Sequence, residues 1–60
     1  MDRLLKLHEV EDVTALSRST IYEWMRKGKF PQPLVLSTRS VRWRASAVAE
    51  WMDRLPGRSA

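Results

Sequence analysis

Hydrophobic residues recur at helical spacing in the middle of the chain, where Ile21, Trp24 and Met25 lie three and four positions apart. That spacing places the three side chains on one face of a helix. Ser17 precedes the stripe as a candidate N-cap, because its hydroxyl can accept a free backbone N–H of the first turn. Gly28 suits the position just past the helix C-terminus. The pattern therefore predicts a capped helix between these two residues.

The other face of this predicted helix, residues 17–27, carries cations and hydroxyl groups. Such side chains bond to base edges and to phosphate oxygens. A capped, basic helix resting on an apolar stripe is typical of an element that enters a groove of DNA. The polar residues that point away from the stripe are Arg18, Ser19, Thr20, Tyr22 and Arg26.

A shorter helix is predicted before it, over residues 8–15, with Val10, Val13 and Leu16 as its apolar face. The apolar run at residues 3–7 is so short that its period fits a helix or a strand, and we predict a strand. Two short helices in succession, joined by a tight turn, form a helix-turn-helix pattern. Both helices and the turn are expected in the first half of the chain.

The first helix is acidic near its N-terminus, where the helix dipole favours negative charge. Carboxylates repel phosphate, so we expect this end of the helix to face solvent, away from nucleic acid. The acids concerned are Glu9, Glu11 and Asp12.

In the segment after the second helix, the spacing of apolar residues changes from that of a helix to that of a strand. Pro31 and Pro33 cannot continue a helix. Two strands are predicted over residues 34–36 and 41–44, joined by a polar turn at 37–40. Together they form a hairpin.

The second strand of that hairpin alternates apolar and basic side chains. Val41 and Trp43 are therefore expected to face the core, and Arg42 and Arg44 to face the other way. Arg39 falls near the tip of the hairpin, where its cation is available to a minor groove.

The last predicted helix, residues 45–55, has the clearest amphipathic pattern, and the Pro-Gly pair that follows ends it. A single domain is expected over residues 1–56, with 57–60 as a disordered tail. The three Trp are expected to supply core volume that so short a chain otherwise lacks. The apolar positions of this helix are Val48, Trp51, Met52 and Leu55.

Charge is concentrated in the middle of the chain. The whole sequence carries +4, but residues 17–44 hold seven of the eleven cations and one of the seven acids, a net of +6. Such a cluster indicates a polyanion-binding surface. The alternative is a basic surface that serves only solubility. Clustering on one helix and one hairpin favours binding.

Other classes of function find little support. The chain has no cysteine, which excludes disulfides and thiolate metal sites and suits a reducing cytoplasm. It has no apolar run long enough to cross a membrane and no apolar core of a secretion signal. His8 is the only histidine, and there is no Gly-rich phosphate loop. We expect no enzyme activity, no cofactor, no metal and no small-molecule ligand.

Each candidate contact has a structural alternative. Ser19 and Thr20 could help to cap the helix, and Tyr22 could cover the core. Arg26 and Lys27 are expected to clamp phosphate, although cations at a helix C-terminus also offset the dipole. The arginines of the second strand could instead keep an edge strand soluble. The candidate DNA-binding residues are Ser17, Arg18, Ser19, Thr20, Tyr22, Arg26, Lys27, Lys29, Thr38, Arg39, Arg42 and Arg44.

The sequence resembles the AlpA family of small phage-type DNA-binding regulators, and several of the residues above carry the resemblance. This family is related to excisionases and to MerR-like winged-helix domains. The similarity extends from about Arg3 to Leu55. Two positions depart from the pattern: Ala15 stands where such turns often carry Gly, and the hairpin turn lacks Gly. The matching residues are Leu16 to Tyr22, Gly28, Phe30, Pro31, Pro33, Arg39, Val41, Trp43, Arg44, Val48 and Trp51.

The resemblance implies a winged helix-turn-helix fold, mainly α with a small β-hairpin, with the second helix in the major groove and the hairpin as wing. It implies transcriptional regulation, or control of the direction of prophage recombination, in the bacterial cytoplasm at the nucleoid. The expected partner is double-stranded DNA, with a second copy on adjacent sites, an integrase or RNA polymerase left open. The alternative is a protein-interaction adaptor whose basic face docks an acidic partner through an exposed Tyr22.

Overall fold

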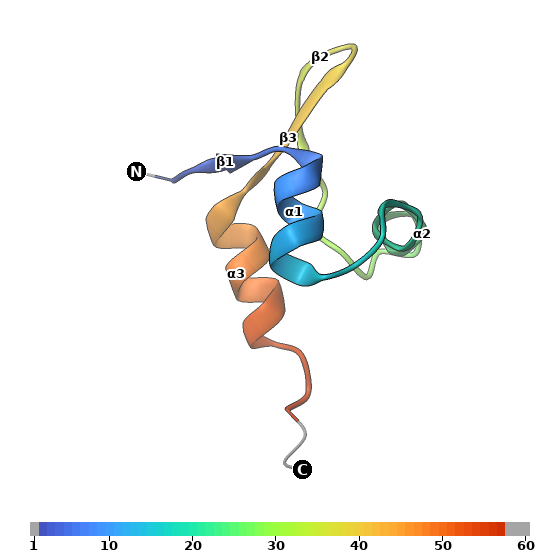
Figure 1. Ribbon diagram of the computed structural model, residues 1–60, viewed down its shortest axis with the longest axis vertical. Helices are drawn as coiled ribbons and strands as arrows, with labels where there is room; N and C mark the ends of the chain where they lie inside the picture. The colour runs from blue at the N-terminus through green and yellow to red at the C-terminus, as the bar shows by residue number, and fades with distance from the viewer. Residues whose placement is uncertain (1, 58–60) are drawn as a thin grey trace.

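The computed structural model describes residues 2–57 and has three helices and three short strands (Figure 1). Helices α1 (Leu7–Thr14) and α2 (Arg18–Arg26) with the turn between them form a helix-turn-helix. The hairpin of β2 (Leu34–Ser37) and β3 (Ser40–Arg44) is the wing. The winged helix-turn-helix expectation is confirmed. In chain order the elements are β1 Leu4–Leu5, α1 Leu7–Thr14, α2 Arg18–Arg26, β2 Leu34–Ser37, β3 Ser40–Arg44 and α3 Ala45–Asp53.

The three strands form one antiparallel sheet in the order β1-β3-β2. Leu5 pairs with Trp43, and Val35 pairs with Val41. The predicted strand at residues 3–7 is reduced to Leu4–Leu5, because Leu7 already begins α1. The sheet thus fixes strand β1 against the base of the wing.

Both ends of α2 are closed as the sequence predicts. Ser17 accepts a hydrogen bond from the backbone N–H of Thr20 at 3.2 Å. At the other end Gly28 has φ +71° and donates to the carbonyl of Met25, while the N–H of Lys29 donates to the carbonyl of Trp24 at 2.7 Å. This pair of bonds is a Schellman motif, which needs a left-handed residue at the glycine. The helix is held at a fixed length.

The turn between α1 and α2 depends on Ala15, whose φ of +61° is left-handed. An L-residue with a Cβ adopts that conformation at a cost of about 1–2 kcal/mol. Thr14 supports the turn, since its hydroxyl donates to the carbonyl of Val10 at 2.7 Å and accepts from the N–H of Leu16. The chain therefore makes this turn without glycine and with some strain.

The hairpin turn also lacks glycine, and it avoids the left-handed region. Ser37 pairs with Ser40 across Thr38 and Arg39, and neither turn residue has a positive φ. The two-residue turns that fit a regular hairpin need positive φ. The strands accommodate this turn by a register shift between Val35 and Ser37. Arg39 lies at the tip, as predicted.

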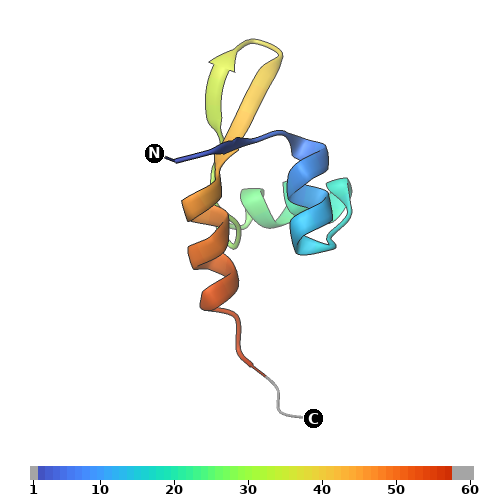
Figure 2. The ribbon, with the colours of Figure 1, turned by 60° about the vertical axis from the view of Figure 1, so that its left-hand side comes forward.

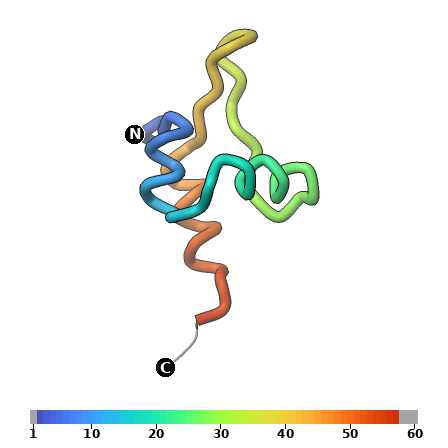
Figure 3. The backbone as a smooth tube through the Cα atoms, turned by 45° about the vertical axis from the view of Figure 1, so that its right-hand side comes forward, coloured from blue at the N-terminus to red at the C-terminus, as the bar shows by residue number. Residues whose placement is uncertain are grey.

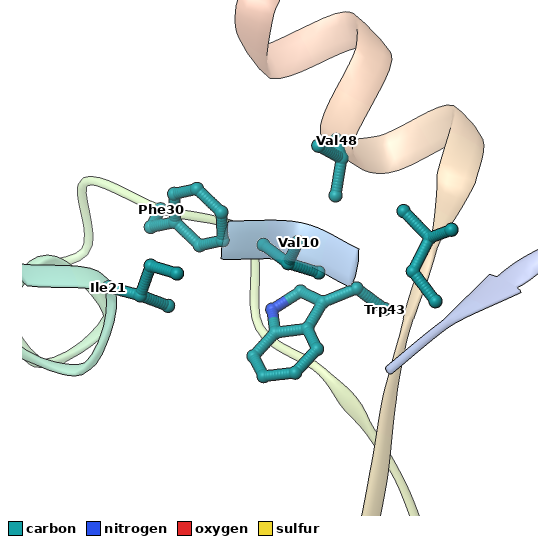
Figure 4. Close-up of a cluster of buried hydrophobic side chains, with 6 residues drawn as sticks. Val10, Ile21, Phe30, Trp43 and Val48 are labelled. Carbon is teal, nitrogen blue, oxygen red and sulfur yellow. The ribbon is translucent and has the colours of Figure 1, made fainter. Parts of the chain in front are cut away.

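The core gathers around Trp43, which is fully buried between the helices (Figure 4). Its indole N–H donates to the carbonyl of Pro31 at 3.0 Å, so the one polar atom of the ring is satisfied. Val41 packs against the core, and Arg44 on the alternate face is exposed. The buried residues are Leu5, Val10, Ile21, Phe30, Trp43 and Val48.

Two residues that periodicity places in the core are exposed. Val13 is exposed because α1 turns Leu7 and Val10 inward, and Val13 lies off that line. Leu55 is exposed because α3 ends at Asp53, two residues earlier than predicted. The Trp expectation holds in part, since Trp24 and Trp51 are half-buried at the edge of the core.

The molecule is elongated, with principal extents of 42 × 28 × 19 Å. Figure 2 and Figure 3 show the hairpin projecting from one end and α3 running toward the other, with α2 between them at the side. No helix within residues 2–57 is long and apolar enough to cross a membrane. The residues predicted as tail lie mostly outside the described part, which ends at Gly57.

Candidate nucleic-acid interface

The outward face of α2 carries a row of exposed polar side chains. Arg18, Tyr22 and Arg26 follow one another at four-residue steps and are exposed, and exposed Ser19 lies beside them. Residues at that spacing share one side of a helix. The opposite side is held by Ile21, which is fully buried. The packing of the apolar stripe therefore turns this polar row toward solvent. Figure 1 shows α2 at the side of the molecule.

The hydroxyls at the start of α2 are partly engaged within the protein. The hydroxyl of Ser17 donates to Oγ1 of Thr20 at 2.9 Å while it accepts the backbone N–H of Thr20. Ser17 therefore serves as the cap, and Thr20 is half-buried against it. In these two bonds Thr20 uses its hydroxyl oxygen as an acceptor and its backbone N–H as a donor, so its hydroxyl proton is not used in either. Ser19 has no cap bond among residues 2–57, so it is the more available hydroxyl.

Three cations of the basic segment pair with acids. Arg18 lies 3.8 Å from Glu11, and Arg44 lies 3.8 Å from Asp2. Lys27 pairs with Glu23 one helical turn away, at 3.0 Å. The hydrogen bond from the Lys27 ammonium holds the pKa of Glu23 below its ordinary value of 4.5. The cation of each pair is exposed, and a phosphate could compete for it.

The remaining cations of the basic segment form no ion pair within residues 2–57. Arg26, Lys29 and Arg39 are exposed, on α2, in the following loop and at the hairpin tip. Arg42 is half-buried, and its guanidinium donates to the carbonyl of Val41 at 2.8 Å. The expectation that it faces away from the core thus holds only in part, because its stem folds along its own strand.

The wing also exposes two apolar side chains that sequence reasoning did not single out. Val35 is 73% exposed and Leu36 is 55% exposed, both on the outer strand β2. Thr38 and Arg39 continue from them to the tip. The available signal was the short apolar run at residues 34–36, which carries no charged residue. The wing therefore presents apolar surface next to a cation.

The acidic helix α1 does not lie wholly apart from this surface. Glu9 is turned back by the N–H of Lys6 at 2.8 Å and by Arg3 at 2.6 Å, and the Lys6 hydrogen bond lowers its pKa below 4.5. Glu11, however, reaches the first residue of α2, Arg18. The tight turn at Ala15 brings these two helix ends together.

Residues 2–57 contain no cluster of histidine and acidic side chains that could hold a metal ion. An open hollow of about 370 Å³ lies between the loop after α2 and helix α3. Its lining includes the aromatic residues Phe30 and Trp51 and the cations of Lys29 and Arg54. Every buried side-chain polar atom in the described part of the chain is hydrogen-bonded.

Comparison with known proteins gives a consistent picture. The family model described as Prophage CP4-57 regulatory protein (AlpA) matches residues 3–56. The chain is 47% identical over 58 residues to the uncharacterized protein ORF88 of Enterobacteria phage P4, covering 95% of this chain and 66% of that protein. It is 31% identical over 58 residues to the DNA-binding transcriptional activator AlpA of Escherichia coli (strain K12), covering 87% and 83% of the two chains. No solved structure matches significantly.

The match extends over the helix-turn-helix, the wing and α3 together. The chain spans slightly under two thirds of the phage P4 relative and most of the E. coli one. The resemblance noted from the Ser-Arg-Ser-Thr-Ile-Tyr string and the Trp-Arg pair is confirmed by the family model. The chain belongs to the AlpA family of prophage regulatory proteins.

Proposed function

We propose that the chain binds double-stranded DNA in a sequence-specific manner and acts as a small transcriptional regulator. The observation that carries this proposal is the capped helix α2, whose outward face bears Arg18, Ser19, Tyr22 and Arg26 and whose inner face is fixed in the core. A helix held in this way can enter the major groove as a rigid body. The E. coli relative is described as a DNA-binding transcriptional activator, which supports the same function here.

The two ends of α2 would do different work. Helix-turn-helix proteins contact base edges mainly through the N-terminal part of the second helix. Arg18 could fork onto guanine O6 and N7, and Ser19 could bond a base edge or phosphate. Arg26 and Lys27 at the other end would hold phosphate, because they lie where the helix leaves the groove. Tyr22 lies between them, and its hydroxyl would donate a hydrogen bond to a phosphate of the DNA backbone.

The wing would add contacts beside those of α2. Arg39 at the tip is a candidate for the minor groove, where arginine is attracted by the negative potential. Val35 and Leu36 would lie against the sugar edges of the same groove. Thr38, Arg42, Arg44 and Lys29 would contact the flanking backbone. The DNA in question would be a bacterial or phage genome, in the cytoplasm.

Titration of duplex binding against salt tests the proposal. If about five cations contact phosphate, log K should fall with log salt with a slope near −4.5. Selection of bound duplexes from a random pool should then yield one preferred sequence. No binding at low salt, or a slope near zero, would contradict duplex binding, and a pool without enrichment would contradict sequence specificity.

A role as excision factor is the second candidate within the same class. The exposed apolar pair on the wing favours it, because apolar side chains in a minor groove can unstack and bend DNA, as architectural factors do. A circular-permutation bending assay on the selected site separates the two. Strong bending supports an architectural role, and unbent DNA supports promoter regulation alone.

An adaptor that docks an acidic protein would bind duplex DNA weakly and without preference.

A further inference from the structure

Glu11 is an acidic side chain placed at the head of the candidate recognition helix. Its Oε1 lies 3.8 Å from Nε of Arg18, the residue that begins α2. We propose that Glu11 is a positioning residue that steers Arg18 away from phosphate and toward a base edge, and so raises discrimination between the preferred site and random DNA. The inference rests on the proposed function and adds a specificity-determining residue to it.

The backbone fixes the relative position of the two side chains. The N–H of Ala15 donates to the carbonyl of Glu11 at 2.8 Å, and the left-handed φ of Ala15 then turns the chain into α2. The side chain of Glu11 is only 29% exposed, whereas that of Arg18 is 70% exposed. The acid is therefore the more confined partner, and the guanidinium of Arg18 is the more exposed one.

The neighbouring acids do not share this placement. Glu9 is occupied by Arg3 and by the N–H of Lys6. Asp12 is exposed and forms no ion pair within the described part of the chain. Glu11 thus combines confinement with contact to a candidate base reader.

The two kinds of DNA acceptor respond differently to this carboxylate. A phosphate that approaches Arg18 brings a full negative charge close to Glu11, and like charges at short range repel. The O6 and N7 atoms of guanine are neutral acceptors, so they meet much less repulsion. On random DNA, where no guanine is correctly placed, Arg18 therefore gains little from the backbone. On the preferred site it gains its full base contact.

A structural role does not account for the pair. Exposed ion pairs at this separation contribute little to folding, because water screens the charges and the side chains lose entropy. The consequence of Glu11 should therefore appear in DNA binding rather than in stability. The effect of Glu11 on DNA binding should also depend on the presence of Arg18 and not on net charge alone.

The test compares Glu11→Gln with Asp12→Asn, which removes the same charge one residue further along α1. Both are measured on the selected site and on random duplex, over a range of salt. We expect Glu11→Gln to tighten random binding roughly two- to fivefold and to steepen its salt slope by about 0.9, the effect of one added phosphate contact. Site affinity should change less, so the ratio of site to random affinity falls. Asp12→Asn should shift both affinities by the same factor.

A double-mutant cycle with Arg18→Ala shows whether Glu11 acts through Arg18. In the Arg18→Ala background, Glu11→Gln should behave like Asp12→Asn and leave the specificity ratio unchanged. Equal behaviour of Glu11→Gln and Asp12→Asn in the parent would overturn the inference while leaving the proposed function intact. Failure of the parent itself to select a site would contradict the proposed function instead. Thermal melts of all variants exclude loss of fold.

Discussion

The indole N–H of Trp51 donates to the carbonyl of Lys29 across 2.8 Å. The same ring meets Phe30 edge-on, with 4.7 Å between the ring centroids. Helix α3 is thereby fastened to the loop that follows α2, and Trp43 fastens the loop again at Pro31. Two tryptophans thus fix the segment between the candidate recognition helix and the wing. The wing is held relative to α2 by side-chain bonds to backbone carbonyls.

Substitution of Trp51 should separate the contribution of its hydrogen bond from that of its ring packing. Trp51→Phe keeps most of the ring and removes the hydrogen bond, so the free energy of unfolding should fall by about 1 kcal/mol. Trp51→Ala should cost about 3–5 kcal/mol and nearly unfold a domain of this size. Urea unfolding followed by circular dichroism measures both. A thermal midpoint of Trp51→Ala within a few degrees of the parent would show that α3 is held by other contacts.

Replacement of Ala15 should stabilise the protein. Ala15→Gly relieves the left-handed strain but makes the unfolded chain more flexible, and the balance should raise the free energy of unfolding by about 0.5–1 kcal/mol. Ala49→Gly is the matched control, because Ala49 is exposed inside α3 and should lose about 1 kcal/mol. If both substitutions destabilise alike, the turn is not strained in solution.

The pH dependence of stability should reflect Asp2, which caps the start of α3. Its two oxygens accept the hydroxyl and the N–H of Ser46 at 2.7 and 3.0 Å, and these bonds hold its pKa below 3.8. Because the folded pKa is the lower one, the stabilisation is present above the unfolded pKa and is lost as pH falls through the folded value. The free energy of unfolding should be level between about pH 7 and 5 and decline below about pH 4.

The variant Asp2→Asn provides the control for that decline. It removes the titrating carboxylate but keeps an oxygen acceptor, so it should be less stable than the parent at pH 7 and lose less on acidification. Glu9 also has a lowered pKa, which leaves some of the decline in place. A parent whose stability is unchanged from pH 6 to pH 3 would contradict the cap.

The contribution of the wing can be measured with Arg39→Ala. Loss of a cation at the hairpin tip should weaken binding to duplex DNA several-fold and reduce the salt slope by about 0.9. Arg54→Ala removes the same charge from α3, where the guanidinium pairs with Glu50 at 3.5 Å, and should leave the slope almost unchanged. Equal effects of the two substitutions would mean that only net charge matters at the wing.

Local chemistry determined the parts of the fold that the sequence allowed us to predict. Ser17 and Gly28 closed α2 as expected, because caps depend on neighbouring residues alone. Helical spacing correctly placed Ile21 and Val48 in the core. The predictions that Val13 and Leu55 lie in the core were wrong, because periodicity cannot say where a helix ends or how far its apolar face is covered. Those limits come from tertiary packing.

The candidate site divides in the same way. The basic face of α2 and the position of Arg39 followed from helix and hairpin periods. The approach of Glu11 to Arg18 did not, because it depends on the angle set by the turn at Ala15. The hydrogen bond from the Arg42 guanidinium to the carbonyl of Val41 likewise depends on its surroundings in the sheet.

The central claim is that the N-terminal end of α2 reads bases and its C-terminal end holds phosphate. Arg18 and Arg26 lie on the same face of α2 and carry the same charge, so net charge alone predicts equal effects when each is removed. The decisive measurement is the affinity of Arg18→Ala and Arg26→Ala for the selected site and for random duplex. Arg18→Ala should lose about 1–3 kcal/mol on the site and much less on random DNA, while Arg26→Ala should weaken both equally. Equal losses on both duplexes for Arg18→Ala would contradict base reading by this end of the helix.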